Sequence, residues 1–186
     1  TRDLVPVIMH DEKVDRTTDG SGYVYDLTFD EIRRLDCSYP DKFGGKFGQL
    51  EVTSLREYLE WMAEEENLIT NIELKNSVYY YGGMERMVMD MICEYGLEDR
   101  IILSSFNNAS IVLCRQNDDT IAGGFLVERC VENAGVYART CDVQYYHPNM
   151  DYLKEEHVRS CSQNGVGVNV WTVNEKEDMR RMKKWG

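Results

Sequence analysis

Residues 101–127, IILSSFNNASIVLCRQNDDTIAGGFLV, contain two short apolar runs, IILSS at 101–105 and GFLV at 124–127. Between them lies a stretch of helical character that begins near Asn108. The runs do not alternate apolar and polar residues, which is typical of strands that are buried on both faces. A helix that joins two such strands predicts a βα unit in a parallel sheet.

Similar apolar runs occur on both sides of this unit. They are TNIEL at 70–74, DVQYY at 142–146 and VGVNVWTV at 166–173. The five runs recur roughly every 20 to 30 residues, which is the rhythm of repeated βα units. The sequence therefore predicts an α/β fold with a parallel sheet of at least five strands.

Helix signals fall between these runs. Ser54 and Glu57 form a capping box, and an apolar stripe along residues 84–92 is closed by Gly96. Further helices are predicted from near Asn108, over residues 151–164 and from Asn174 onward. The methionines in these stripes are interpreted as core residues rather than as a cofactor surface.

The first 52 residues have a different character. Residues 4–9 form one extended apolar run, and residues 10–52 are rich in Asp, Gly, Thr and Tyr with little periodicity. PDKFGGKFG at 40–48 is predicted to be a loop. We interpret residues 1–186 as one partial domain in which residues 10–52 are a small insertion.

The charge of the chain limits its partners. With 21 Lys and Arg against 33 Asp and Glu, the formal net charge is −12. Such a surface repels nucleic acid and anionic membranes, so neither is an expected partner. An anionic substrate would need a local positive charge, for which a divalent metal ion is the simplest source.

The cysteines and the lengths of the apolar runs indicate the cellular compartment of the protein. The six cysteines form no CxxC pair, and we interpret them as reduced, mostly buried thiols of a cytoplasmic protein. No run of about 18 apolar residues could span a bilayer. The chain starts at Thr1 and is expected to be a fragment, so an upstream signal or membrane anchor would not be visible.

Three residues stand out as candidates for chemistry. His10 follows the apolar run 4–9 beside Asp11, where it could exchange a proton near neutral pH or simply be a surface histidine. Glu73 and Lys75 are two residues apart in IELK, so they point to the same side of a strand. They could form a structural ion pair, or they could be a metal ligand beside a phosphate-binding cation.

Two aromatic residues occupy strand ends. Phe106 follows IILSS, and Trp171 lies in VWTVN near the end of the last run, where parallel α/β proteins bind ligands. Either ring could instead belong to the core. The chain has no P-loop and no GxGxxG, GxSxG or HExxH motif, so nucleotide binding and serine hydrolysis have no support from motifs.

The N-terminal stretch VPVIMHDEKVDRTTDGSGYVYDLTFDEIRRLD, residues 5–36, resembles the glycerophosphodiester phosphodiesterase family. The resemblance continues in order through NIELK, RIILSSF, GGFL and VNVWTVN, and so covers nearly the whole chain. It implies a TIM (β/α)8 barrel that hydrolyses glycerophosphodiesters to an alcohol and glycerol 3-phosphate. It also implies a bound Mg²⁺ or Ca²⁺ ion at the carboxyl ends of the strands.

The resemblance also implies roles for individual residues. His10 matches the histidine that protonates the leaving alcohol, Glu73 matches a metal ligand, and Lys75 matches the cation that faces the phosphate. Phe106 and Trp171 would line the substrate pocket. The family's HRG and ELD motifs and its closing TD strand are not in this chain, so two strands at the start and one at the end are expected to be missing. The chain alone is therefore expected to be inactive.

Two alternatives remain beside the hydrolase. Lys75 could form a Schiff base in an aldolase-like barrel. The chain could also be an inactive barrel that acts as a binding module, tethered to a membrane segment. The flanking sequence would separate the hydrolase from the inactive barrel, and borohydride trapping on Lys75 would identify the aldolase.

Overall fold

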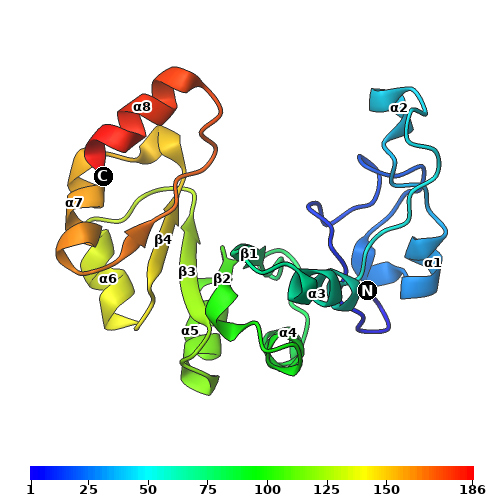
Figure 1. Cartoon of the computed structure of the whole chain (residues 1–186), viewed down its shortest axis with the longest axis horizontal. Coiled ribbons are helices and arrows are strands. Elements are labelled where there is room, and N and C mark those ends of the chain that lie inside the picture. Colours follow the sequence, from blue (N-terminus) through cyan, green and yellow to red (C-terminus); the bar gives the residue numbers. More distant parts are fainter.

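A computed structural model describes residues 1–186, apart from the side chain of Pro40. One five-stranded sheet runs through the described residues in the order β1-β2-β3-β4-β5, and all neighbouring strands are parallel. The strands are β1 (Thr70–Glu73), β2 (Ile101–Ser105), β3 (Ala122–Val127), β4 (Tyr145–Pro148) and β5 (Gly167–Val168). The sheet is curved and open, with β1 and β5 at its edges (Figure 1). This confirms the predicted parallel α/β architecture.

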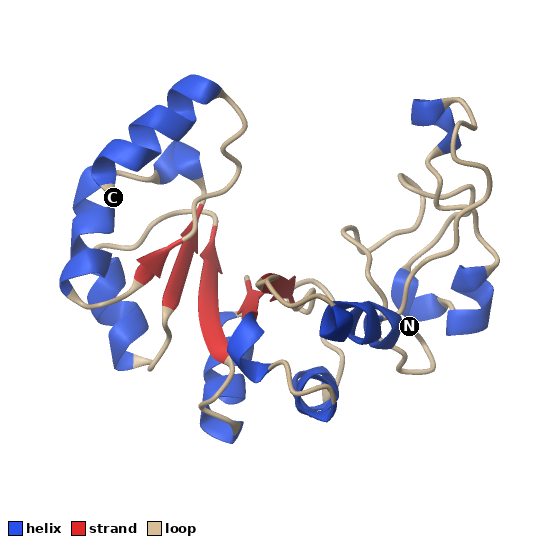
Figure 2. Ribbon diagram, viewed as in Figure 1, coloured by secondary structure: helices blue, strands red, loops and turns tan.

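The helices that connect the strands lie along the outer side of the curved sheet (Figure 2). The helices are α1 (Phe29–Arg33), α2 (Pro40–Phe43), α3 (Leu55–Glu64), α4 (Met84–Glu94), α5 (Asn108–Asn117), α6 (Ala134–Thr140), α7 (Glu155–Gln163) and α8 (Lys176–Trp185). Short 3-10 turns are η1 (Val24–Asp26), η2 (Glu98–Arg100) and η3 (Met150–Tyr152). Each strand from β1 to β4 is thus followed by a helix before the next parallel strand, as βα units require.

Local sequence signals explain several helix ends. The Ser54 hydroxyl accepts a hydrogen bond from the Glu57 N–H, and the Glu57 carboxylate accepts one from the Ser54 N–H at 2.8 Å, so the predicted capping box starts α3. After α4, Gly96 takes a left-handed φ of 62°. The N–H of Leu97 then donates to the Ile92 carbonyl at 3.2 Å, which satisfies a carbonyl at the end of the helix.

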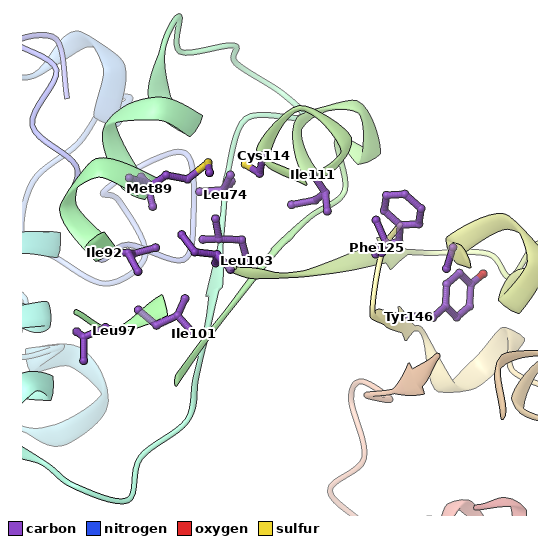
Figure 3. Packing of buried hydrophobic residues seen from close by; sticks show 14 of the residues in the cluster. Leu74, Met89, Ile92, Leu97, Ile101, Leu103, Ile111, Cys114, Phe125 and Tyr146 are labelled. Carbon is purple, nitrogen blue, oxygen red and sulfur yellow. The ribbon is translucent and has the colours of Figure 1, made fainter. Parts of the chain in front are cut away.

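The main core lies between the sheet and its helices. Leu74, Leu103, Phe125 and Tyr146, one from each of four neighbouring strand segments, are completely or almost completely buried there. Figure 3 shows these side chains beside residues from α4 and α5. The buried Met62 and Met89 belong to the same cluster, and Met84 and Met91 pack against it, so these methionines of α3 and α4 are core residues as predicted, whereas Met179 on α8 is 49% exposed.

Residues 1–52 contain a smaller cluster, formed by Val14, Val24, Ile32 and Val52. The region has no strand among the elements that the structure describes. The apolar run 4–9 makes only an isolated antiparallel bridge, between Val7 and Ser54, and forms no regular strand before His10. The assignment of residues 10–52 as an insertion stays a prediction.

The structure changes some predicted boundaries. Strand β4 begins at Tyr145 rather than at residue 142, because Asp142 has a left-handed φ of 54° in the turn after α6. Helix α6 was not predicted, since its seven residues carry only a weak apolar pattern. Strand β5 ends at Val168, and beyond it Trp171 forms only an isolated bridge with Asn149.

Smaller corrections concern a loop and the cysteines. Helix α2 occupies the start of the segment 40–48, which was predicted to be a loop. All six cysteines are free thiols, but only Cys114 and Cys161 are buried and Cys93 is exposed, so the prediction of mostly buried thiols was wrong. Within the described part of the chain, every helix is too short or too polar to cross a membrane.

Candidate active site

The side chains of β1 alternate between two environments. Asn71, Glu73 and Lys75 are two residues apart, and all three line one cavity. Leu74 points the opposite way, into the core. On β2, Ile102 and the following Phe106 line the same cavity. The pleat of the sheet therefore separates a cavity-facing side from a helix-facing side.

The cavity has a volume of about 1210 Å³ and brings together all five residues that the sequence singled out. They are His10, Glu73, Lys75, Phe106 and Trp171. A second, more apolar cavity of about 430 Å³ also borders His10, Glu73 and Lys75. The candidate residues thus converge from distant parts of the chain, whereas their chemical roles stay predictions.

Glu73 and Lys75 form an ion pair in the cavity wall. The Lys75 ammonium lies 3.0 Å from the Glu73 carboxylate, and about a quarter of each side chain is exposed. Both residues stand at the carboxyl end of β1, where the Leu74 N–H continues the ladder by donating to the Ser104 carbonyl. One carboxylate and one ammonium are therefore held side by side facing the cavity.

His10 presents an exposed imidazole that is anchored by one nitrogen. Its Nδ1 lies 2.7 Å from Oδ1 of Asp11, while 76% of the side chain is accessible. Asp11 also accepts two hydrogen bonds from the Arg16 guanidinium, at 2.6 and 2.8 Å. These bonds from Arg16, together with the one to His10, hold the pKa of the Asp11 carboxyl well below its usual range.

Two aromatic rings meet across the cavity. The rings of Phe106 and Trp171 pack edge to face with centroids 5.6 Å apart. The Trp171 indole N–H donates a hydrogen bond of 2.9 Å to the His147 carbonyl. Trp171 is thus fixed to β4, and Phe106, which is 39% exposed, packs against it in the cavity wall.

His147 lines the cavity but was not among the candidate residues from the sequence. It lies within β4 and is buried. Its Nε2 lies 3.0 Å from the Asn169 amide nitrogen, and burial lowers the pKa of His147 to about 4. Gly124 makes room for the ring, because a Cβ there would lie 2.5 Å from Nε2. The signal that could have found it is the proximity of YYHP to a strand end.

A buried polar network supports the site from behind. Asn76, which directly follows Lys75, donates from its amide to Glu85 at 3.0 Å and to Ser110 at 2.6 Å. Ser110 also donates to Glu85, and the Ser105 hydroxyl donates to the side-chain amide oxygen of Asn76 at 3.0 Å. The network links the ends of β1 and β2 to the starts of α4 and α5, so it fixes the segments that carry Lys75 and Phe106.

The expected Mg²⁺ or Ca²⁺ can be tested against these residues. Such ions take six or more oxygen ligands, usually including several carboxylates. Glu73 offers a carboxylate in the cavity, but among the described residues no three His, Cys, Asp or Glu side chains gather into a metal-binding group. The residues of this chain therefore do not form a metal site by themselves.

Comparisons with known proteins agree with this geometry. The model of the glycerophosphoryl diester phosphodiesterase family matches residues 1–186. A glycerophosphodiester phosphodiesterase from Caldanaerobacter subterraneus is 37% identical over the whole chain, which covers 75% of that protein. One from Bacillus altitudinis is 31% identical, with 100% of this chain and 76% of that protein covered.

A solved structure shows the same fold. A Silicibacter pomeroyi protein, assigned as a glycerophosphoryl diester phosphodiesterase, superposes with a TM-score of 0.87 at 25% identity. The match covers 100% of this chain and 74% of the other. Structures of this family are TIM barrels, and the five parallel strands found here form an open part of such a barrel.

Proposed function

Since the chain belongs to the glycerophosphoryl diester phosphodiesterase family, a family of phosphoric diester hydrolases, we propose that it serves the hydrolysis of glycerophosphodiesters. The products are an alcohol and glycerol 3-phosphate. The observation that carries the proposal is the convergence of His10, Glu73 and Lys75 on one cavity. Relatives that are 37% and 31% identical are named for this activity. The aldolase and binding-module alternatives have no comparable support.

His10 acts as the general acid. Hydrolysis breaks the bond between phosphorus and the alcohol oxygen and forms a new bond from phosphorus to a water oxygen. The leaving oxygen takes a proton from the imidazole, while the water gives up a proton to a base. Because Nδ1 of His10 is engaged by Asp11, Nε2 is the nitrogen that delivers the proton.

Lys75 and the aromatic wall bind the substrate. The Lys75 ammonium faces the cavity and offsets the negative charge of the phosphodiester, which a chain of net charge −12 would otherwise repel. Phe106 and Trp171 provide apolar contact for the glycerol or for the head group of the substrate. Glu73 holds the Lys75 side chain in place through their 3.0 Å ion pair.

A divalent cation, Mg²⁺ or Ca²⁺, is part of the proposal because the family is generally metal-dependent. Glu73 is the residue of this chain that could contribute an oxygen ligand to it from the cavity wall. An ion of this kind would stabilise charge that develops on the phosphoryl oxygens. The described residues do not complete its coordination, so we assign no step to it.

The first test is an assay of the full-length protein on glycerophosphocholine with Mg²⁺ or Ca²⁺. We expect hydrolysis with at least one of the two ions. His10→Ala should lower kcat by about 10²- to 10⁴-fold with a smaller change in KM, because a general acid serves the transition state. An unchanged kcat in a folded His10→Ala variant would exclude the role of His10.

The role of Lys75 has a matched control in the chain. Lys154 pairs with Glu156 at 3.3 Å, also two residues away, but on the exposed surface and outside the cavity. Lys75→Met should raise KM by about 10- to 100-fold through loss of a charge-assisted contact with the phosphate, whereas Lys154→Met should leave KM unchanged. Equal effects of the two variants would contradict phosphate binding by Lys75.

A further inference from the structure

Asp11 forms hydrogen bonds with two side chains at once. Its Oδ1 accepts from Nδ1 of His10 at 2.7 Å and from the Arg16 guanidinium at 2.8 Å, while its Oδ2 accepts from Nε of Arg16 at 2.6 Å. The guanidinium therefore donates a hydrogen bond to each of the two carboxylate oxygens. Paired bonds of this kind fix the plane of the carboxylate as well as its position.

The position of the carboxylate determines how the imidazole is presented. A carboxylate oxygen only accepts hydrogen bonds, so Nδ1 of His10 must carry the proton of the shared bond. In the neutral ring Nε2 is then the free acceptor, and in the imidazolium it is the free donor. Since the His10 side chain is 76% exposed, neighbouring atoms alone do not fix the ring, and the bond to Asp11 is its main restraint.

We propose that Arg16 is a positioning residue that acts through Asp11 to hold the His10 imidazole with Nε2 directed at the substrate. The proposal rests on the function proposed above for His10. Asp11 by itself could rotate about its side-chain bonds and take Oδ1 away from the ring. The two bonds from Arg16 remove that freedom, and Arg16 also bears a positive charge that offsets the negative charge of Asp11.

Substitutions of Asp11 and of Arg16 should displace the pH–rate profile in opposite directions. Asp11→Asn removes a negative charge beside the imidazolium, so the basic limb of the pH–rate profile should move to lower pH. Arg16→Gln leaves the Asp11 charge unbalanced beside the same ring, so the limb should move to higher pH. Each displacement should be about one pH unit. Displacements of opposite sign would show that both charges act on the His10 ring, and the alignment of the ring is tested separately.

The other charged or titratable groups around His10 remain the same in all variants. They line the two cavities that border the ring, and they are the Thr1 amino group, Glu12, Tyr58, Glu73, Lys75, Tyr81, His147 and Lys183. A difference between Asp11→Asn and Arg16→Gln therefore reports on the Asp11–Arg16 pair rather than on these groups.

Arg16→Lys separates charge from geometry. A lysine keeps the positive charge but lacks the two-pronged guanidinium. We expect kcat to fall about tenfold in Arg16→Lys and in Arg16→Gln, because the acid is no longer aligned, with the basic limb displaced only in Arg16→Gln. The control is Arg86→Gln on α4, since Arg86 donates to Asp90 at 3.0 Å on the exposed surface away from both cavities. It should leave kcat and the profile unchanged.

The decisive experiment combines pH–rate profiles of the full-length protein on glycerophosphocholine with ¹⁵N NMR of its histidines. In the wild type we expect His10 with the proton on Nδ1, and in Arg16→Gln a mixture of both tautomers. His10→Gln identifies the resonance. Unchanged tautomer and unchanged profile in a folded Arg16→Gln variant would overturn the proposal. Absence of hydrolysis in the wild type would instead refute the proposed function, and the tautomer measurement would still decide the role of Arg16.

Discussion

The sheet with helices α4–α7 and the N-terminal region, residues 1–52, lie at different ends of the molecule (Figure 1). The sheet is held by one continuous apolar cluster that includes Phe125 and Tyr146. The N-terminal region has only a small cluster around Val14 and Ile32. Because apolar burial provides most of the stabilisation of a fold, the sheet should tolerate loss of a polar contact better than the N-terminal region does.

Polar contacts supply much of what orders the N-terminal region. Arg33 lies 2.6 Å from both Glu51 and Glu57. The Asp36 carboxylate accepts from the N–H groups of Ser38 and Leu50 at 2.9 and 3.1 Å. A hydrogen bond from the Ser54 N–H, together with the ion pair to Arg33, lowers the pKa of Glu57 to about 2. The candidate site draws on both kinds of region, since His10 comes from the N-terminal one and Glu73 from the sheet.

The largest expected change in the free energy of unfolding comes from truncating a side chain in the sheet core. Phe125 is fully buried and stacks on Tyr137 with ring centroids 4.9 Å apart. Phe125→Ala should lower the free energy of unfolding by about 3–5 kcal/mol, through lost burial and the cavity left behind. Urea denaturation measures this change.

Phe47 in the N-terminal region is the matched control, because the same truncation there removes a ring that is 49% exposed. Phe47→Ala should change the free energy of unfolding by less than about 0.5 kcal/mol. Similar losses in the two variants would show that the regions do not differ in the way described.

The next effect is the pH dependence that arises from His147. Its folded-state pKa of about 4 lies below the ordinary value of 6.5, so the native state favours the neutral ring. The corresponding stability is fully present above pH 6.5 and is lost as the pH falls from 6.5 toward 4. The difference between the two pKa values corresponds to a loss of about 3 kcal/mol in the free energy of unfolding.

Urea denaturation of the wild type and of His147→Gln over this pH range measures the loss. Glutamine keeps an acceptor for Asn169 but does not titrate, so the variant should show a flatter profile between pH 6.5 and 4.5. The ion pair between Arg33 and Glu57 contributes little to the pH dependence between pH 6.5 and 4.5. The pKa of Glu57 is about 2 in the folded state, so the stability it provides is lost only as the pH falls below the ordinary carboxyl pKa of 4.5. Parallel profiles for the two proteins would contradict this assignment.

The smallest effect concerns backbone strain in the N-terminal region. Leu4 has a left-handed φ of 62° and its side chain is 55% exposed. Leu4→Gly should raise the free energy of unfolding by about 0.5–1 kcal/mol, since glycine adopts this conformation without the steric cost, partly offset by its greater chain entropy.

Leu50 is a control of the same type, because it is also exposed but its φ is not positive. Leu50→Gly should lower the free energy of unfolding by about 0.5–1 kcal/mol, measured in urea as for Leu4. A loss of stability in both variants would mean that the strain at Leu4 is negligible.

Much of the sheet was predictable because its signals are local. The runs at 70–74 and 101–105 became β1 and β2, and the capping box at Ser54 starts α3 as predicted. The later boundaries were less accurate, since the left-handed turn at Asp142 has no strong signature in the sequence. The candidate residues were found from strand position and from the family resemblance, whereas the contact of Arg16 with Asp11 and the burial of His147 were seen only in the structure.

By itself the sequence determined the order of the five strands along the chain, the family, and the alternation that turns Glu73 and Lys75 to one side of β1, because these depend on neighbouring residues and on the period of the backbone. Only the tertiary structure decided which side chains line the same cavity, how Arg16 binds the Asp11 carboxylate, and that His147 is buried against Asn169. Such contacts join segments far apart in the chain or depend on the path of an irregular loop, and hydrophobic periodicity carries no information about either.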